Sequence, residues 1–129
     1  MDKTYVKDIE KDTLDNDNFR KVVYTGQQMQ LVMMSLLPGE EIGAEVHHDI
    51  DQFFRVESGS GLFVLEGEEI TVSDDWAAIA PAGSEHNIIN NSDEVLKFYT
   101  IYAPAEHPDG TVHKDKAEAD RYEAEHHSH

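Results

Sequence analysis

The sequence contains no cysteine, few basic residues and no long hydrophobic run. Without cysteine the chain has no disulfide, no thiolate nucleophile and no cysteine-based zinc site. Ten Lys and Arg stand against 27 Asp and Glu, which gives a formal net charge of −17. Because such a chain repels phosphate backbones and anionic lipid headgroups, we expect neither nucleic acid nor a membrane surface as its partner.

The chain also lacks membrane-spanning and targeting features. No stretch approaches the roughly 18 apolar residues that a transmembrane helix needs. The opening residues, Met1 to Thr4, have none of the apolar character of a signal peptide. We therefore predict a cytoplasmic protein.

Length and apolar residues together indicate one domain with two tails. The 129 residues fall within the size of a single domain, roughly 100 to 150 residues. Nearly all large apolar side chains lie in residues 19–104, so residues 1–18 form a polar N-terminal segment and residues 105–129 a C-terminal extension. Helix formers at 114–125 predict a weak helix there. The last residues form a tail able to bind metal unspecifically, with histidines at His126, His127 and His129.

The central region has the pattern of an all-β sandwich or barrel. Short apolar or alternating runs are broken by Gly, Pro, Ser or Asp every 8 to 12 positions or so, as expected for strands joined by tight turns. The predicted strands are residues 20–25, 29–37, 53–56, 62–65, 70–72, 76–80 and 95–102.

The run at residues 29–37 is apolar on both faces of a strand, with Met29, Met33 and Met34 among its residues. Core packing explains the inner face. In a barrel of this size the other face should point outward, and an outward Met-rich face needs a covering partner. We therefore predict a homodimer.

The most specific stretch for chemistry is residues 81–90, Pro-Ala-Gly-Ser-Glu-His-Asn-Ile-Ile-Asn. Pro81 and Gly83 form a tight turn that delivers His86 onto the start of the next strand, from which it can project into a barrel. A neutral imidazole is a good ligand for Zn, Fe, Ni, Cu or Mn. Glu85 adjoins His86 at the predicted pocket mouth and is our candidate general base.

Two further histidines and a glutamine precede residues 53–56. On a regular strand His48 shares a face with Val46 and Gln52, while His47 points the other way. A bulge would turn His47 inward instead. Both registers stay open, so the candidate metal ligands are His47, His48, Gln52 and His86.

Residues 81–90 resemble the second cupin motif at every defined position, although Asp75 stands where its preceding glycine is expected. Residues 43–61 resemble the first motif, in which two histidines one residue apart are followed by three or four residues, a glutamate, six residues and a glycine. With the shorter spacer, Val46 and His48 take the histidine positions and Gln52 takes the glutamate position. Residues 46–55, 102–104 and 107–110 are similar to small stand-alone bacterial cupins of the mannose-6-phosphate isomerase-like subfamily.

The resemblance implies a double-stranded β-helix, or jelly-roll cupin barrel, that is frequently dimeric and holds a metal at its mouth. We expect a divalent transition metal (Zn, Ni, Mn, Fe or Cu) and a small-molecule substrate. The predicted function is a metal-dependent enzyme, an isomerase or oxygenase, acting on a small oxygenated or sugar-like metabolite.

Three alternatives remain, because the fold does not determine the substrate. The protein is a non-catalytic module that binds a sugar or another small molecule, a sugar-phosphate isomerase-like enzyme, or a structural oligomer. The charge of −17 disfavours a sugar phosphate unless Arg55 or Lys97 attracts it locally. Without a metal, His86, Gln52 and Asn90 would form a hydrogen-bonded polar patch.

Overall fold

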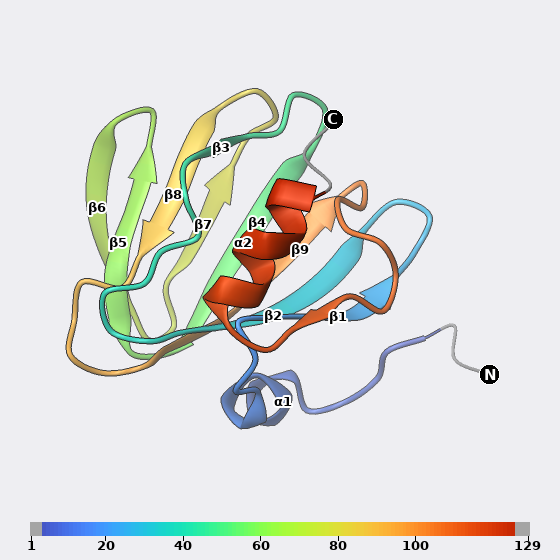
Figure 1. Cartoon of the computed structure of the whole chain (residues 1–129), viewed down its shortest axis with the longest axis horizontal. Helices are drawn as coiled ribbons and strands as arrows, with labels where there is room; N and C mark the ends of the chain where they lie inside the picture. Colours follow the sequence, from blue (N-terminus) through green and yellow to red (C-terminus); the bar gives the residue numbers. More distant parts are fainter. Residues whose placement is uncertain (1–3, 126–129) are drawn as a thin grey trace.

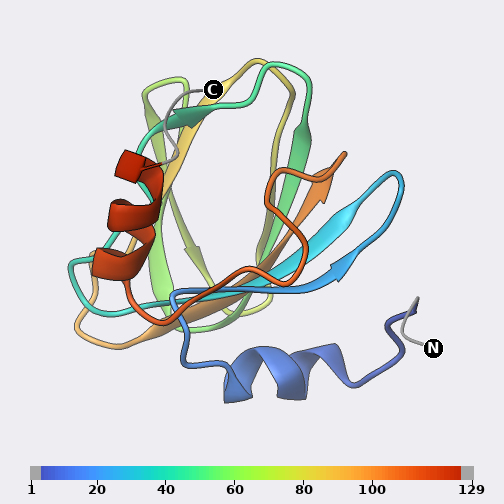
Figure 2. The ribbon, with the colours of Figure 1, turned by 45° about the vertical axis from the view of Figure 1, so that its right-hand side comes forward.

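The computed structural model describes residues 4–125, so the tail histidines His126, His127 and His129 lie outside the described residues. Two antiparallel sheets face each other across one core (Figures 1 and 2). One is six-stranded, in the order β10-β1-β2-β9-β4-β7, and the other is four-stranded, in the order β3-β8-β5-β6. The predicted all-β jelly-roll barrel with a short C-terminal helix is confirmed.

Most strands coincide with the predicted runs. The strands are β1 (Arg20–Thr25), β2 (Gln30–Leu36), β3 (Glu45–Val46), β4 (Asp51–Ser58), β5 (Ser60–Leu65), β6 (Glu68–Ser73), β7 (Ala77–Ala80), β8 (Glu85–Ile89), β9 (Leu96–Ala103) and β10 (Val112–His113). The predicted C-terminal helix is α2 (Lys116–Glu125). Helix α1 (Ile9–Asp15) was not predicted; the Asp8 side chain caps it by accepting the backbone N–H of Lys11.

Both faces of β2 are covered within the chain. Val32, Met34 and Leu36 point into the core between the sheets. Leu31 and Met33 alternate with them on the outer face and are buried there. Helix α1 contacts β9 and β4, and together with the segment before it lies on the outer side of this sheet (Figure 2). Residues 30–36 therefore do not need a second subunit to cover them, although Met29 and Leu37 at the two ends of the run are exposed.

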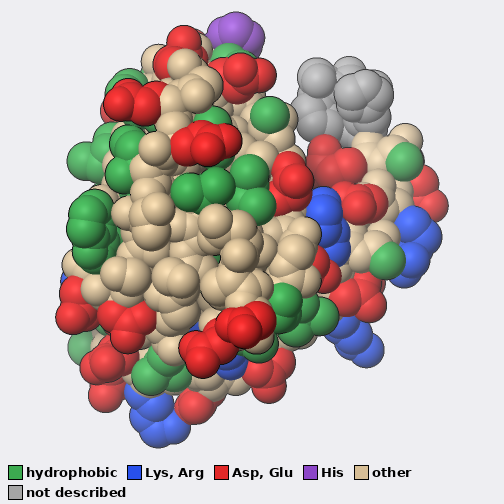
Figure 3. Space-filling model, turned by 90° about the vertical axis from the view of Figure 1, so that its left-hand side faces the viewer, with side chains coloured by type: hydrophobic (Ala, Val, Ile, Leu, Met, Phe, Trp, Pro, Cys, Tyr) green, Lys and Arg blue, Asp and Glu red, His purple; other side chains and the backbone are tan. Residues whose placement is uncertain are grey.

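The two cations singled out in the sequence point away from the barrel interior. Lys97 donates to Asp17 at 2.8 Å and to the Leu14 carbonyl oxygen at 2.7 Å, which ties β9 to the end of α1. Arg55 pairs with Asp75 at 3.1 Å. The face in Figure 3 shows many acidic side chains around apolar patches and few basic ones. Among residues 4–125, neither helix is long and apolar enough to cross a membrane.

Candidate metal centre

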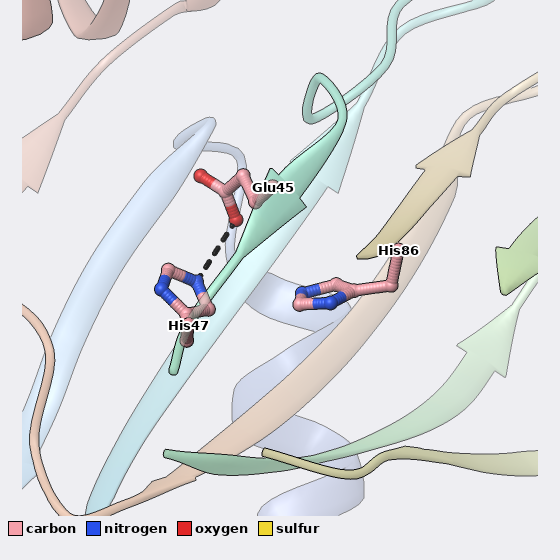
Figure 4. Close-up of side chains that lie close together, drawn as sticks. All are labelled: Glu45, His47 and His86. Atoms are coloured by element: carbon pink, nitrogen blue, oxygen red, sulfur yellow. Dashed lines mark hydrogen bonds and ion pairs between the residues drawn. The ribbon is translucent and has the colours of Figure 1, made fainter. Parts of the chain in front are cut away.

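Three potential ligands meet where β3 pairs with β8. Glu45 and His86 are direct neighbours across this antiparallel pair, and His47 follows Glu45 by two residues. One ligand atom from each of the three side chains lies within 4.8 Å of the other two. Figure 4 shows His86 reaching from β8 toward Glu45 and His47. The Nε2 atom of His47 lies 3.2 Å from Oε1 of Glu45.

The turn before β8 joins the two halves of this site. Gly83 adopts a φ of +88°, a backbone conformation that residues with a Cβ rarely adopt. Its backbone N–H donates to the carbonyl oxygen of His47 at 2.9 Å. The turn that places His86 at the start of β8 thus also fixes the backbone at His47.

Gln52 on β4 adds a fourth polar group from the opposite sheet. Its side chain is buried, and its Oε1 lies 3.0 Å from Nε2 of His86. Its amide nitrogen donates to Thr100 Oγ1 at 2.9 Å, which directs the amide oxygen toward His86. Glu45, His47, Gln52 and His86 therefore combine two imidazoles, one carboxylate and one amide oxygen.

The two histidines have opposite protonation tendencies. Burial lowers the pKa of His86 below its ordinary value. Burial also lowers the pKa of His47, but the hydrogen bond to Glu45 and the charges of Glu45, Glu106 and Glu123 outweigh it and raise the pKa overall. The carboxylates around His47 thus favour positive charge at this end of the barrel, whereas His86 is neutral.

Tyr102 and His107 form the adjoining wall. The Tyr102 ring meets His47 edge-on at 5.9 Å between centroids and His107 at 5.2 Å. His107 Nε2 lies 3.3 Å from the Tyr102 hydroxyl. Burial, with the charges of Arg20 and two other histidines, lowers the pKa of His107 to about 3, so this imidazole is neutral near pH 7.

His47 and not His48 faces His86. The chain turns at residues 48–49 between β3 and β4, which belong to different sheets, so the alternation from Gln52 does not extend back to Val46. His48 is exposed and Val46 is 41% exposed. Of the two registers left open by the sequence, the structure adopts the one with His47 inward.

Glu85 and Asn90 lie apart from the ligand group. Glu85 precedes His86 on β8, where successive residues point to opposite faces, and its side chain is exposed. The Asn90 amide donates to the carbonyl oxygens of Leu36 and Glu94. The predicted polar patch therefore exists between Gln52 and His86 without Asn90.

Glu45 was not among the metal ligands predicted from the sequence. With the longer, four-residue spacer of the first motif, the two ligand positions before Gln52 fall on Glu45 and His47, and six residues then lead to Gly59. The structure follows this spacing. A carboxylate thus stands where the motif has its first histidine, and an amide where it has its glutamate.

The sequence matches the cupin domain family over residues 32–102, a span that includes all four residues of the site, and the chain belongs to this family. The crystal structure of BH2720 from Bacillus halodurans is 43% identical in sequence and superposes with a TM-score of 0.89, covering 91% of this chain and 93% of that chain.

Two curated proteins are also similar. Uncharacterized protein YrkC of Bacillus subtilis is 43% identical over 123 residues, which is 91% of this chain and 66% of YrkC. Uncharacterized protein L612 of Acanthamoeba polyphaga mimivirus is 39% identical over 116 residues, 87% of this chain and 72% of L612. The chain thus spans just under two thirds of YrkC.

Proposed function

We propose that the protein is a metal-dependent enzyme acting on a small oxygenated or sugar-like metabolite. In this proposal Glu45, His47, Gln52 and His86 hold one divalent transition metal. The observation that carries it is the convergence of Glu45, His47 and His86, whose ligand atoms lie within 4.8 Å of one another inside the barrel.

The donor set suits such an ion. Imidazole favours Zn, Ni, Cu and Fe, and a single carboxylate with an amide oxygen also accommodates Mn. When bound, the metal would polarise a carbonyl group or activate a water molecule. Glu45 supplies a carboxylate in the place of a histidine while Gln52 replaces the glutamate, so the set keeps a single negative charge.

The wall beside the site supports an oxygenated substrate. The hydroxyl of Tyr102 and the neutral imidazole of His107 can donate to or accept from hydroxyl and carbonyl oxygens. Phe54 packs edge-on against His86 at 6.0 Å and supplies an apolar base. Arg55 and Lys97 lie on the outer face, so neither supports the sugar-phosphate alternative.

A non-catalytic binding module is the second candidate, and one contact favours it. Because Gln52 already hydrogen-bonds His86, this pair is satisfied without a metal. In such a module the same polar wall would bind a sugar or a related metabolite without converting it.

Metal analysis followed by a substrate screen tests the proposal. His126, His127 and His129 are replaced by Ala in the full-length chain, so that the tail cannot bind metal. We expect about one divalent metal per chain after dialysis, and turnover of at least one hydroxy or oxo metabolite. A metal-free protein that binds sugars unchanged would overturn the enzyme and support the binding module.

Homodimerisation and a cytoplasmic location stay predictions. The outer face of the six-stranded sheet still exposes Ile79 on edge strand β7 (60%) and Met29 (41%), beyond the part covered by α1. We propose that a second copy covers these residues. Light scattering should give twice the chain mass for the unsubstituted protein. Ile79→Glu should shift it to the monomer mass, because the charge disrupts the apolar contact. A monomer mass for the unsubstituted protein at micromolar concentration excludes the dimer.

A further inference from the structure

The loop between β9 and β10, residues 104–111, is held against the inside of the barrel by one buried side chain. It turns back across β2 in Figure 2. Gln30 on β2 is fully buried. Its amide nitrogen donates to the carbonyl oxygen of His107 at 2.7 Å and to Thr25 Oγ1 at 2.9 Å. Its Oε1 accepts the backbone N–H groups of Glu106 at 3.1 Å and His107 at 3.0 Å.

These contacts fix the backbone at Glu106 and His107 much as a neighbouring strand would. Both hydrogen-bonding groups of the Gln30 amide are engaged, and three of the four contacts go to this backbone. A buried amide that lost these partners would pay a desolvation penalty. The loop is therefore anchored at the residues that approach the metal centre.

The anchored loop brings a second carboxylate to His47. Oε1 of Glu106 lies 3.7 Å from Nδ1 of His47, while Nε2 of the same ring lies 3.2 Å from Oε1 of Glu45. The His47 side chain is only 10% exposed. Each ring nitrogen thus faces a different carboxylate, one from β3 and one from the loop.

A histidine that binds metal through one nitrogen usually donates its other N–H to a carboxylate or carbonyl group, which fixes the ring and its tautomer. Nε2 faces Glu45 in the ligand group, so Nδ1 is the nitrogen left for such a partner. We propose that Glu106 is a positioning residue for His47: when Nε2 binds a metal, the Glu106 carboxylate closes from 3.7 Å to accept the Nδ1–H and so directs Nε2 at the metal. This inference rests on the proposed metal site.

Zinc titration tests the role of Glu106. The parent protein is the full-length chain with His126→Ala, His127→Ala and His129→Ala, titrated against a competing chelator. We expect Glu106→Ala to weaken zinc binding by about 10- to 100-fold, the usual effect of removing such a partner. Glu106→Gln should lose less, because its amide oxygen still accepts a hydrogen bond. Glu69→Ala is the control, because it removes one exposed carboxylate on β6, outside the metal centre. This variant should bind zinc like the parent.

Nitrogen-15 NMR of the zinc-loaded proteins separates positioning from a structural effect. The parent should show His47 coordinated through Nε2, with a slowly exchanging Nδ1 proton. In Glu106→Ala this proton should exchange rapidly, although the thermal unfolding of the protein is unchanged. If Glu106→Ala binds zinc as tightly as Glu69→Ala, the positioning role is overturned and the metal site stands. If the parent itself binds no zinc, the proposed metal site is overturned as well.

Discussion

The two ends of the barrel interior are equally buried and chemically opposite. At one end the inward residues of β4, β9 and β2 that lie in register are Gln52, Tyr102 and Gln30. Four positions further along the same strands they are Val56, Phe98 and Met34. All six are buried. Burial alone therefore does not distinguish a site from a core.

The difference lies in what the buried groups do. The apolar row stabilises the fold by removing its side chains from water. The polar row gains nothing comparable and is tolerated because each member is hydrogen-bonded: Gln52 to His86, Tyr102 to His107 and Gln30 to the β9–β10 loop. Polar groups retained in a core at this cost are expected at functional sites.

The largest expected effect is in the apolar row. Phe98→Ala should destabilise the protein by about 3–5 kcal/mol, because it leaves a cavity beside Phe54, whose ring lies 6.1 Å away. Urea denaturation measures the loss. Val6, which is 88% exposed, provides the control: Val6→Ala should change the stability by less than about 0.5 kcal/mol. If Phe98→Ala lowers the free energy of unfolding by less than about 1 kcal/mol, the apolar row is not the part of the core that stabilises the fold.

The polar end of the barrel should make stability depend on pH through His107, the hydrogen-bond partner of Tyr102. Its folded pKa of about 3 lies below the ordinary value of 6.5. As the pH falls below 6.5, the unfolded chain binds a proton that the folded protein does not bind until about pH 3, so stability is lost across this interval. At about 1.4 kcal/mol per pH unit, the loss from this group between pH 6.5 and pH 4 is roughly 3 kcal/mol.

His107→Gln isolates that contribution. Urea denaturation of the metal-free protein at a series of pH values should show a shallower loss of stability for the variant than for the parent. Identical pH profiles for the two proteins would mean that the pKa of His107 is the same in the folded and unfolded states.

Removal of a ligand should affect both metal binding and stability. His86→Ala should weaken zinc or nickel binding by about a hundredfold or more, about 2.7 kcal/mol. It also leaves the Gln52 oxygen without its histidine partner, which costs about 1–3 kcal/mol of stability. Calorimetric titration of the variant lacking the tail histidines measures the affinity. Unchanged binding would show that the metal site lies outside this end of the barrel.

The sequence predicted features whose causes are local. Gly, Pro and Ser turns delimit the strands, and the Pro81–Gly83 turn determines the place of His86. The Asp8 cap was a local signal for α1 that we did not use. The roles of Gln30 and Glu106 could not be predicted, because residues 76 positions apart meet only when β2 and β9 pair. Glu45 was missed because the spacer before Gln52 allowed two alignments.

The smallest expected effects test which face of the chain at His47 and His48 looks inward. His47→Ala removes a group that contacts both Glu45 and Glu106, so metal affinity should fall by at least about tenfold, or 1.4 kcal/mol. His48→Ala should leave affinity nearly unchanged, because His48 lies exposed in the turn between β3 and β4.

On a regular strand Val46→His would add an inward ligand beside His48. In the structure it adds an imidazole on the exposed face, so it should produce no gain. Titrating the three variants with zinc in the background lacking the tail histidines compares them directly. A loss of binding in His48→Ala together with a gain in Val46→His would show that Val46 and His48, rather than His47, point into the barrel.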